Sequence, residues 1–191
     1  SPHRHAFSED HRRVLEVIGA QVSDTLRRAV TFQRERHLVD RDSHTGLPNA
    51  RQLERIVSTE LALGESSVPL SILIVRITID ERRGRQSPED VLRLLAETSR
   101  PALRGADLVF HFAPHELAIL LLRTDDESSQ RVMRRVAKRL ATEQRLPSDV
   151  SITIGLASTP SDGLSLSELL NIAGQREQTL SEYISTSPSI H

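Results

Sequence analysis

The stretch Arg104-Gly-Ala-Asp-Leu-Val-Phe-His-Phe-Ala-Pro-His-Glu-Leu-Ala-Ile-Leu-Leu-Leu122 decides the fold of this chain. It contains two β-prone runs, one from Val109 to Phe112 and an almost wholly apolar one from Leu117 to Leu122. The four residues between these runs are too few and too polar for anything except a tight turn. The stretch therefore predicts a β-hairpin whose second strand is buried.

Other elements are predicted on both sides of this hairpin. The apolar runs from Val68 to Ile79 and from Val150 to Ala157 indicate strands, and the first has the β-branched, two-sided apolar character of a central strand. Helices are predicted over about 49–63, from 88 to about 103 after the N-cap Ser87, over about 126–145, and from the Ser165–Glu168 capping box through to about 183. This order predicts an α/β domain with a mostly antiparallel central sheet flanked by helices.

Composition excludes several classes of protein. The chain has 191 residues and a net charge of −1, so it is long enough for one domain with an extension and carries no overall basic field for nucleic acid or membranes. It has no cysteine, which excludes disulfides and thiolate metal sites and fits a cytoplasmic location. No apolar run is long enough to span a bilayer. Because the sequence starts without Met, we expect a fragment of a longer protein.

The N-terminal segment predicts a long helix that begins near Phe7. Apolar or small residues follow one another at steps of three and four along a weak heptad seam, at Leu15, Ile18, Val22, Thr25, Ala29, Phe32, Arg36 and Val39. One interpretation is a parallel helix that joins two protomers and transmits a signal; the other is a helix packed on its own domain. We prefer the first, and divide the chain into a helix (1–41), a domain (42–185) and a loose tail (186–191).

The segment Asp42-Ser-His-Thr-Gly-Leu-Pro-Asn49 carries the most specific motif. Gly46 and Pro48 end the preceding helix, and Asn49 can cap the next one. The segment resembles the Asp-x-Leu-Thr-Gly-Leu-Pro-Asn-Arg-Arg motif of GGDEF domains, which make or sense cyclic di-GMP, and departs from it at His44 and Ala50. The resemblance extends from Asp42 to Tyr183 and implies the ferredoxin-like core that GGDEF domains share with nucleotide cyclases. Residues 7–30 also resemble the last helix of a GAF domain.

The hairpin resembles a degenerate form of the family's Gly-Gly-Asp/Glu-Glu-Phe signature. Its five positions hold Ala113, Pro114, His115, Glu116 and Leu117, so that Glu116 alone matches, and an acid at a hairpin tip is expected to be solvated.

The resemblance also places Arg76 and Thr78 at the family's Asp-x-Asp, whose first Asp holds Mg²⁺, and Ser181 at its phosphate-binding Lys. It therefore implies that this chain is not an enzyme and has no catalytic residue, metal site or cofactor. Asp80 as a shifted metal ligand is a less favoured alternative.

Arg104 and Asp107 stand where the family has its inhibitory Arg-x-x-Asp site for cyclic di-GMP. An Arg can donate two hydrogen bonds to guanine, and a carboxylate can accept from its N–H groups. The resemblance adds Arg135 to this site, with Arg131 and Arg134 as near alternatives. The simpler interpretation is a surface ion pair between Arg104 and Asp107.

These residues imply a catalytically inactive receptor for cyclic di-GMP that regulates an attached or associated effector. The expected partners are this ligand, a second copy of the chain through the N-terminal helix, and an unknown effector or upstream sensor domain. The alternative is a ligand-free dimerisation or protein-interaction scaffold, and an active diguanylate cyclase ranks last. The basic face from Arg131 to Arg139 lacks the aromatic platforms of a nucleic-acid site. A metal site from His44, His111 and His115 is disfavoured, and His111 is expected at the surface.

Overall fold

The computed structural model describes residues 40–62, 69–80 and 86–186. The chain divides into two compact units, Ser1–Asp40 and Arg41–His191, and the fold below is that of the second. The predicted N-terminal helix, its heptad seam and its role in joining protomers lie outside the described residues.

A five-stranded sheet forms the centre of the domain. Its strands follow the spatial order β2-β3-β1-β4-β5, and neighbouring strands in this order pair antiparallel. The strands are β1 (Leu70–Ile79), β2 (Leu108–Ala113), β3 (Glu116–Leu122), β4 (Val150–Ser158) and β5 (Gln178–Thr179). The helices are α2 (Ala50–Ala62), α3 (Pro88–Ser99), η1 (Arg100–Ala102), α4 (Asp126–Ala141), α5 (Leu166–Gln175) and α6 (Leu180–Thr186). The predicted fold class and the hairpin are confirmed.

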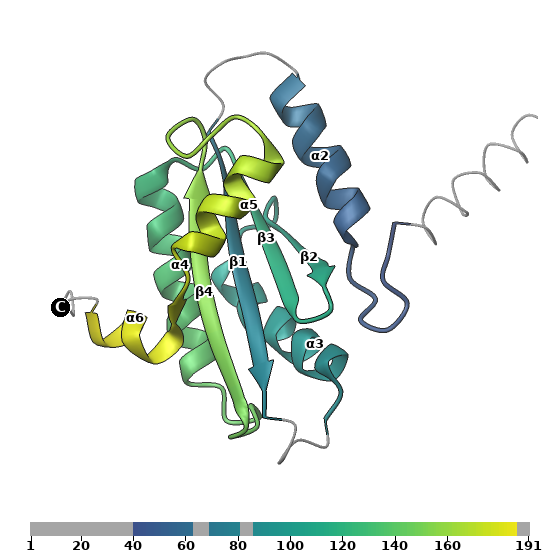
Figure 1. The fold of residues 1–191 in the computed structure, drawn as a ribbon, viewed down its shortest axis with the longest axis vertical. Helices are drawn as coiled ribbons and strands as arrows, with labels where there is room; N and C mark the ends of the chain where they lie inside the picture. The colour runs from purple at the N-terminus through teal and green to yellow at the C-terminus, as the bar shows by residue number, and fades with distance from the viewer. Residues whose placement is uncertain (1–39, 63–68, 81–85, 187–191) are drawn as a thin grey trace, which may run out of the picture. The chain divides into compact units, whose positions relative to one another are not determined.

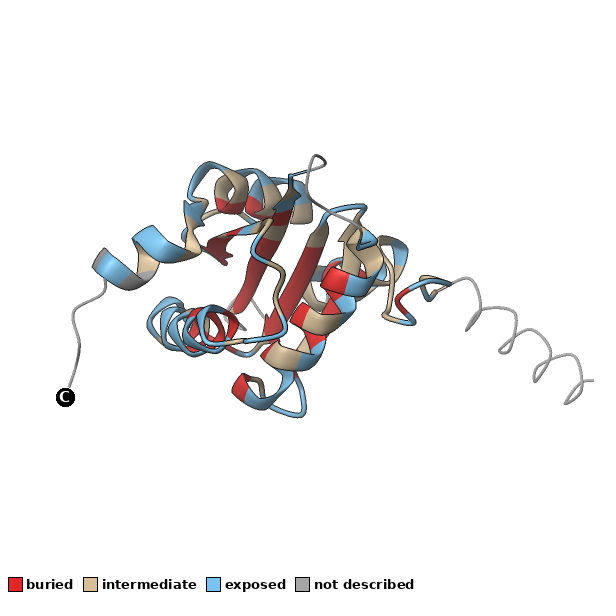
Figure 2. Ribbon diagram, turned by 90° about the horizontal axis from the view of Figure 1, so that it is seen from below, coloured by how far each residue is buried: buried red, intermediate tan, exposed pale blue. Residues whose placement is uncertain are grey.

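Helices cover both faces of this sheet (Figures 1 and 2). Along β1, Leu73, Val75 and Ile77 pack in one buried cluster with residues of α3 and α4. The alternate residues Ile72 and Ile74 pack in a second cluster with α2 and α5. Because successive side chains of a strand point to opposite faces, β1 is buried on both sides, as its apolar sequence predicts.

The predicted helix starts are confirmed by their caps. The Ser87 side chain accepts a hydrogen bond from the Asp90 N–H at 3.2 Å, and Asn49 Oδ1 accepts from the Gln52 N–H at 3.1 Å. Ser165 and Glu168 form the reciprocal capping box at the start of α5. These polar side chains satisfy N–H groups that have no partner within the helix, so each helix begins where its cap stands.

Helix ends were predicted less well. The helix after Ser87 ends at Ser99 and continues as the short 3-10 turn η1, in which Pro101 has no N–H to donate. Helix α4 ends at Ala141 rather than near 145.

The predicted single C-terminal helix is wrong, because α5 stops at Gln175 and β5 then pairs with β4 at Thr153 and Ile154. None of the described helices is long and apolar enough to cross a membrane.

Candidate functional site

The β2–β3 turn consists of Pro114 and His115, which are exposed. Glu116 is the first residue of β3 and pairs with Arg76 of β1, so it lies on the sheet and not at the tip. Its side chain is 19% exposed, and the expectation that it is solvated is wrong. The physical reason is the cross-strand neighbour, which provides an opposite charge within hydrogen-bonding distance.

Arg76 is the centre of an ion-pair network. Its Nε donates to Glu116 Oε1 at 2.8 Å, and its Nη1 donates to Glu177 Oε2 at 2.9 Å. Thr153, the β4 residue paired with Arg76, donates from its hydroxyl to the same Glu177 oxygen at 2.8 Å. Neighbouring strands thus bring Glu116, Arg76 and Thr153 into one row, and the segment after α5 adds Glu177.

Glu177 is the most enclosed member of this network. Its side chain is 9% exposed, and its Oε1 is buried with no hydrogen-bond partner among the described residues. Gly155 allows this arrangement, because a Cβ at that position would lie 2.1 Å from the carbonyl oxygen of Ala173 and 3.1 Å from Glu177 Cγ. The close approach of α5 to β4 therefore requires glycine.

The 40–49 loop is closed around Asp42. Its Oδ1 accepts hydrogen bonds from the Thr45 N–H and hydroxyl, both at 2.7 Å, and lies 3.0 Å from His111 Nδ1. Partial burial raises the pKa of Asp42, but hydrogen bonds from Thr45 and His111 outweigh it and lower the pKa to about 2. The loop therefore holds an ionised carboxylate against the outer strand of the sheet.

His111 is not the surface residue that the sequence suggested. Its side chain is 11% exposed, because the 40–49 loop packs over it, and its backbone N–H donates to the Pro48 carbonyl at 2.8 Å. In the described part of the chain, no group of three or more His, Asp or Glu side chains is arranged to hold a metal ion. His115 lies in the exposed turn.

Arg104 and Asp107 form a closed turn before β2. Asp107 Oδ2 accepts from the Arg104 N–H at 2.7 Å, and the Asp107 N–H donates to the Arg104 carbonyl at 3.1 Å. Asp107 is 3% exposed, whereas Arg104 is exposed. The aspartate thus fixes the loop through its backbone, and the arginine side chain is free to project from it.

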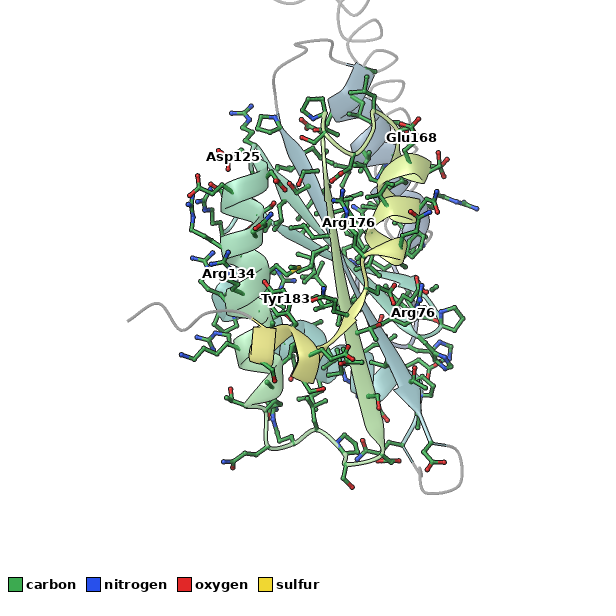
Figure 3. The ribbon with its side chains drawn as sticks, turned by 60° about the vertical axis from the view of Figure 1, so that its left-hand side comes forward. Arg76, Asp125, Arg134, Glu168, Arg176 and Tyr183 are labelled. Atoms are coloured by element: carbon green, nitrogen blue, oxygen red, sulfur yellow. The ribbon has the colours of Figure 1, made fainter. Side chains whose placement is uncertain are left out.

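Arg131, Arg134 and Arg135 are all exposed on α4 (Figure 3 labels Arg134). Asp125 caps this helix, and hydrogen bonds from Ser128 lower its pKa, followed by the positive charges of Arg131 and Arg104. The structure therefore brings Arg104 and Arg131 close to one carboxylate. Arg131 also pairs with Glu127 and donates to Ser128 Oγ at 2.8 Å.

Glu177 is the site residue that sequence reasoning missed. It is 101 positions from Arg76 in the chain and belongs to no motif, so no local pattern could have linked the two. A break in the last helix was detectable, because Thr179 and Glu182 form a second capping box: the Thr179 N–H donates to Glu182 Oε2 at 3.1 Å, and the Glu182 N–H to Thr179 Oγ1 at 3.3 Å.

A sheet of this order with the hairpin, the 40–49 loop and the four flanking helices matches a known family. The family profile described as "Diguanylate cyclase, GGDEF domain" matches residues 39–182. The chain belongs to the GGDEF family.

Two relatives with different names are similar in sequence to part of this chain. "Diguanylate cyclase DosC" of Escherichia coli (strain K12) is 28% identical over 131 residues, which cover 63% of this chain and 28% of DosC. "Cyclic di-GMP phosphodiesterase NbdA" of Pseudomonas aeruginosa is 31% identical over 100 residues, 50% of this chain and 13% of NbdA. The chain thus spans well under a third of the curated relatives that it matches.

Solved structures show the same fold. The GGDEF domain of YfiN (TpbB) from Pseudomonas aeruginosa superposes with a TM-score of 0.62 at 25% identity, over 77% of this chain and 90% of that one. The diguanylate cyclase SiaD of the same species, solved in complex with its activator SiaC, gives a TM-score of 0.67 at 21% identity, over 94% of this chain and 71% of that one.

Proposed function

We propose that this GGDEF domain is a catalytically inactive receptor for cyclic di-GMP, and that binding regulates an attached or associated effector. The observation that carries the proposal is that the charges of two exposed arginines, Arg131 and Arg104, both help to lower the pKa of Asp125, and that Arg104 stands at the position of the family's Arg-x-x-Asp motif. The names of DosC and NbdA connect both relatives with cyclic di-GMP. Since this chain covers only part of each relative, the effector belongs to the proposal as well.

In the proposed site, the guanidinium of Arg104 faces a guanine edge or a phosphate of the ligand. Guanine O6 and N7 accept two parallel hydrogen bonds from a single guanidinium. Arg135 and its neighbours Arg131 and Arg134 add positive charge from α4 for the two phosphates. Asp107 positions Arg104 in the proposed site, because its Oδ2 accepts from the Arg104 N–H and holds the turn closed.

The residues around Arg76 support the absence of cyclase activity. The divalent cation that the resemblance implies for GGDEF cyclases does not fit, because a guanidinium already lies between Glu116 and Glu177. At about 4 Å and an effective dielectric constant near 20, each unit of like charge costs roughly 4 kcal/mol. Ala113 and Pro114 also replace glycines that would let the backbone approach a nucleotide closely.

A second candidate function is a ligand-free scaffold for dimerisation or protein interaction. It is favoured by one observation: Asp107 is buried and already accepts a hydrogen bond from the Arg104 N–H. An aspartate that serves the loop alone would be expected in a domain whose ligand site has been lost.

The first prediction separates these functions by isothermal titration of the 191-residue chain with cyclic di-GMP. We expect micromolar or tighter binding, and a loss of about tenfold or more in affinity for Arg104→Ala, since one bidentate guanine contact contributes about 1–3 kcal/mol. Arg135→Ala, compared with Arg131→Ala and Arg134→Ala, identifies the α4 residue that contributes most.

Arg51→Ala is the matched control, because Arg51 is an exposed arginine on α2, over the other face of the sheet. It should bind like the parent. No heat at high ligand concentration would retire the receptor in favour of the scaffold. GTP turnover by the parent would contradict the inactive assignment.

A further inference from the structure

The network around Arg76 has an unusual charge arrangement. One guanidinium is shared by two carboxylates, at 2.8 Å from Glu116 and 2.9 Å from Glu177. The exposed fractions fall from 43% for Arg76 to 19% for Glu116 and 9% for Glu177, so the positive charge lies on the solvent side of two more enclosed negative ones. A carboxylate so deeply buried is costly unless a positive charge compensates it.

The oxygen atoms of this network would suit a different cation. Two carboxylates converge on the space that the guanidinium fills, and the Thr153 hydroxyl lies beside them as the hydrogen-bond donor to Glu177 Oε2. Such hard oxygen donors are the ligands that Mg²⁺, Mn²⁺ and Ca²⁺ select. The second oxygen of Glu177, Oε1, is buried and has no hydrogen-bond partner among the described residues.

We propose that Arg76 is a built-in cation, which fills a site that would otherwise take a divalent metal ion. The charge at position 76 then decides whether the site accepts a metal ion, because the surrounding carboxylates keep the ability to bind one. The native chain compensates Glu116 and Glu177 without any ion from solution. The inference goes beyond cyclic di-GMP binding, because Arg76 points from the face of the sheet opposite to α4 (Figure 3).

The backbone supports a fixed site at this place. Glu116 and Thr153 are held by the strand register on either side of Arg76. Glu177 is held by the close approach of α5 to β4 at Gly155, and by the pairing of Gln178 with Ile154. These constraints act on the main chain, so we expect both carboxylates to stay within reach of a cation when the guanidinium is removed.

The second prediction is tested by titrating Mn²⁺ into the whole chain, followed by electron paramagnetic resonance and calorimetry. The parent should show no saturable binding, whereas Arg76→Gln and Arg76→Ser should each bind one Mn²⁺ with a Kd of about 10⁻⁴–10⁻³ M, the range of weak divalent sites. Arg76→Lys is the matched control, because it keeps the positive charge and should remain without metal. Glu177→Gln, added to Arg76→Gln, should abolish the new binding.

Three results would overturn the inference. One is Mn²⁺ binding by the parent that Glu177→Gln removes. Another is a folded Arg76→Gln or Arg76→Ser chain that binds no Mn²⁺. The third applies if Arg76→Gln and Arg76→Ser are partly unfolded. We then expect Mn²⁺ to raise their unfolding temperature and to leave that of Arg76→Lys unchanged. The absence of this rise would contradict the inference.

Discussion

Asp42 shows how a single carboxylate fastens the 40–49 loop to the sheet. It accepts hydrogen bonds from the His44 and Thr45 N–H groups and the Thr45 hydroxyl, and it contacts His111 of β2. These contacts favour the ionised form and lower the pKa of Asp42 from 3.8 to about 2, in spite of partial burial. This charge therefore fastens the loop to β2 together with the backbone hydrogen bond from the His111 N–H to the Pro48 carbonyl.

The third prediction follows from the sign of this shift. A carboxyl group whose pKa is lower in the folded state stabilises the fold above its unfolded pKa, and this stabilisation is lost as the pH falls through 3.8 toward 2. Asp42→Asn should therefore be less stable than the parent by about 1–3 kcal/mol near neutral pH, and the difference should shrink toward zero near pH 2. Urea unfolding at a series of pH values measures it.

Asp149→Asn provides a matched control, because Asp149, just before β4, is a half-buried aspartate like Asp42. Its stability should follow that of the parent across the same pH series. A gap between Asp42→Asn and the parent that stays constant down to pH 2 would show that Asp42 is not fastening the loop through its charge.

At this scale the sequence could predict caps but not charge networks. Ser87 and Asn49 were found because a cap acts within three residues of itself. Glu177 was missed because its partner lies on another strand, and the hydrogen bond that Asp107 accepts from the backbone of its own turn was not predicted. Motif spacing locates such residues but does not show where their side chains point.

At the scale of whole elements, the break between helices α5 and α6 was not predicted. We predicted one helix because no Gly or Pro lies between Gln175 and Leu180, although Thr179 and Glu182 have the spacing of a capping box. Tertiary contacts decide otherwise: β5 pairs with β4, and Glu177 is held by Arg76 and Thr153. The break thus reflects long-range pairing that outweighs local helix propensity.

The fourth prediction compares two glycines, Gly155 of β4 and Gly174 of α5. Gly155→Ala should destabilise the domain by about 1–3 kcal/mol or more, because its Cβ would meet the Ala173 carbonyl oxygen at 2.1 Å. Gly174→Ala should be neutral or stabilising by about 0.5–1 kcal/mol, because a Cβ there meets nothing within 4 Å. Thermal unfolding of both variants measures the difference. Equal stabilities would mean that α5 does not pack closely on β4.

The overall fold of the domain was easier to predict from the sequence than its individual contacts. Hairpin, central strand and helix order could be obtained from the sequence, because alternation and apolar runs report which faces are buried. Both faces of β1 are indeed covered, by α3 and α4 on one side and by α2 and α5 on the other. The sequence could not show that α4, with the arginines proposed to bind cyclic di-GMP, and Arg76 belong to opposite faces, since this depends on which residues of β1 face each side.

The fifth prediction uses this separation. If the two sites act through different faces of the sheet, Arg76→Gln should leave the affinity for cyclic di-GMP unchanged within about twofold, because distant sites without shared partners are additive to about 0.3–0.5 kcal/mol. Arg104→Ala combined with Arg76→Gln should then lose as much affinity as Arg104→Ala alone. Calorimetry on the four chains closes this double-mutant cycle.

A coupling energy well above that limit would contradict independence. Coupling between the two sites would pass along β3. This strand carries Glu116 at one end, and its other end leads through Leu122 to Asp125 and α4. Mn²⁺ then provides the deciding measurement: in Arg76→Gln, saturation of the new metal site should leave cyclic di-GMP affinity unchanged if the faces are independent. If β3 transmits the change, the affinity should shift, and by linkage cyclic di-GMP should alter Mn²⁺ binding by the same factor.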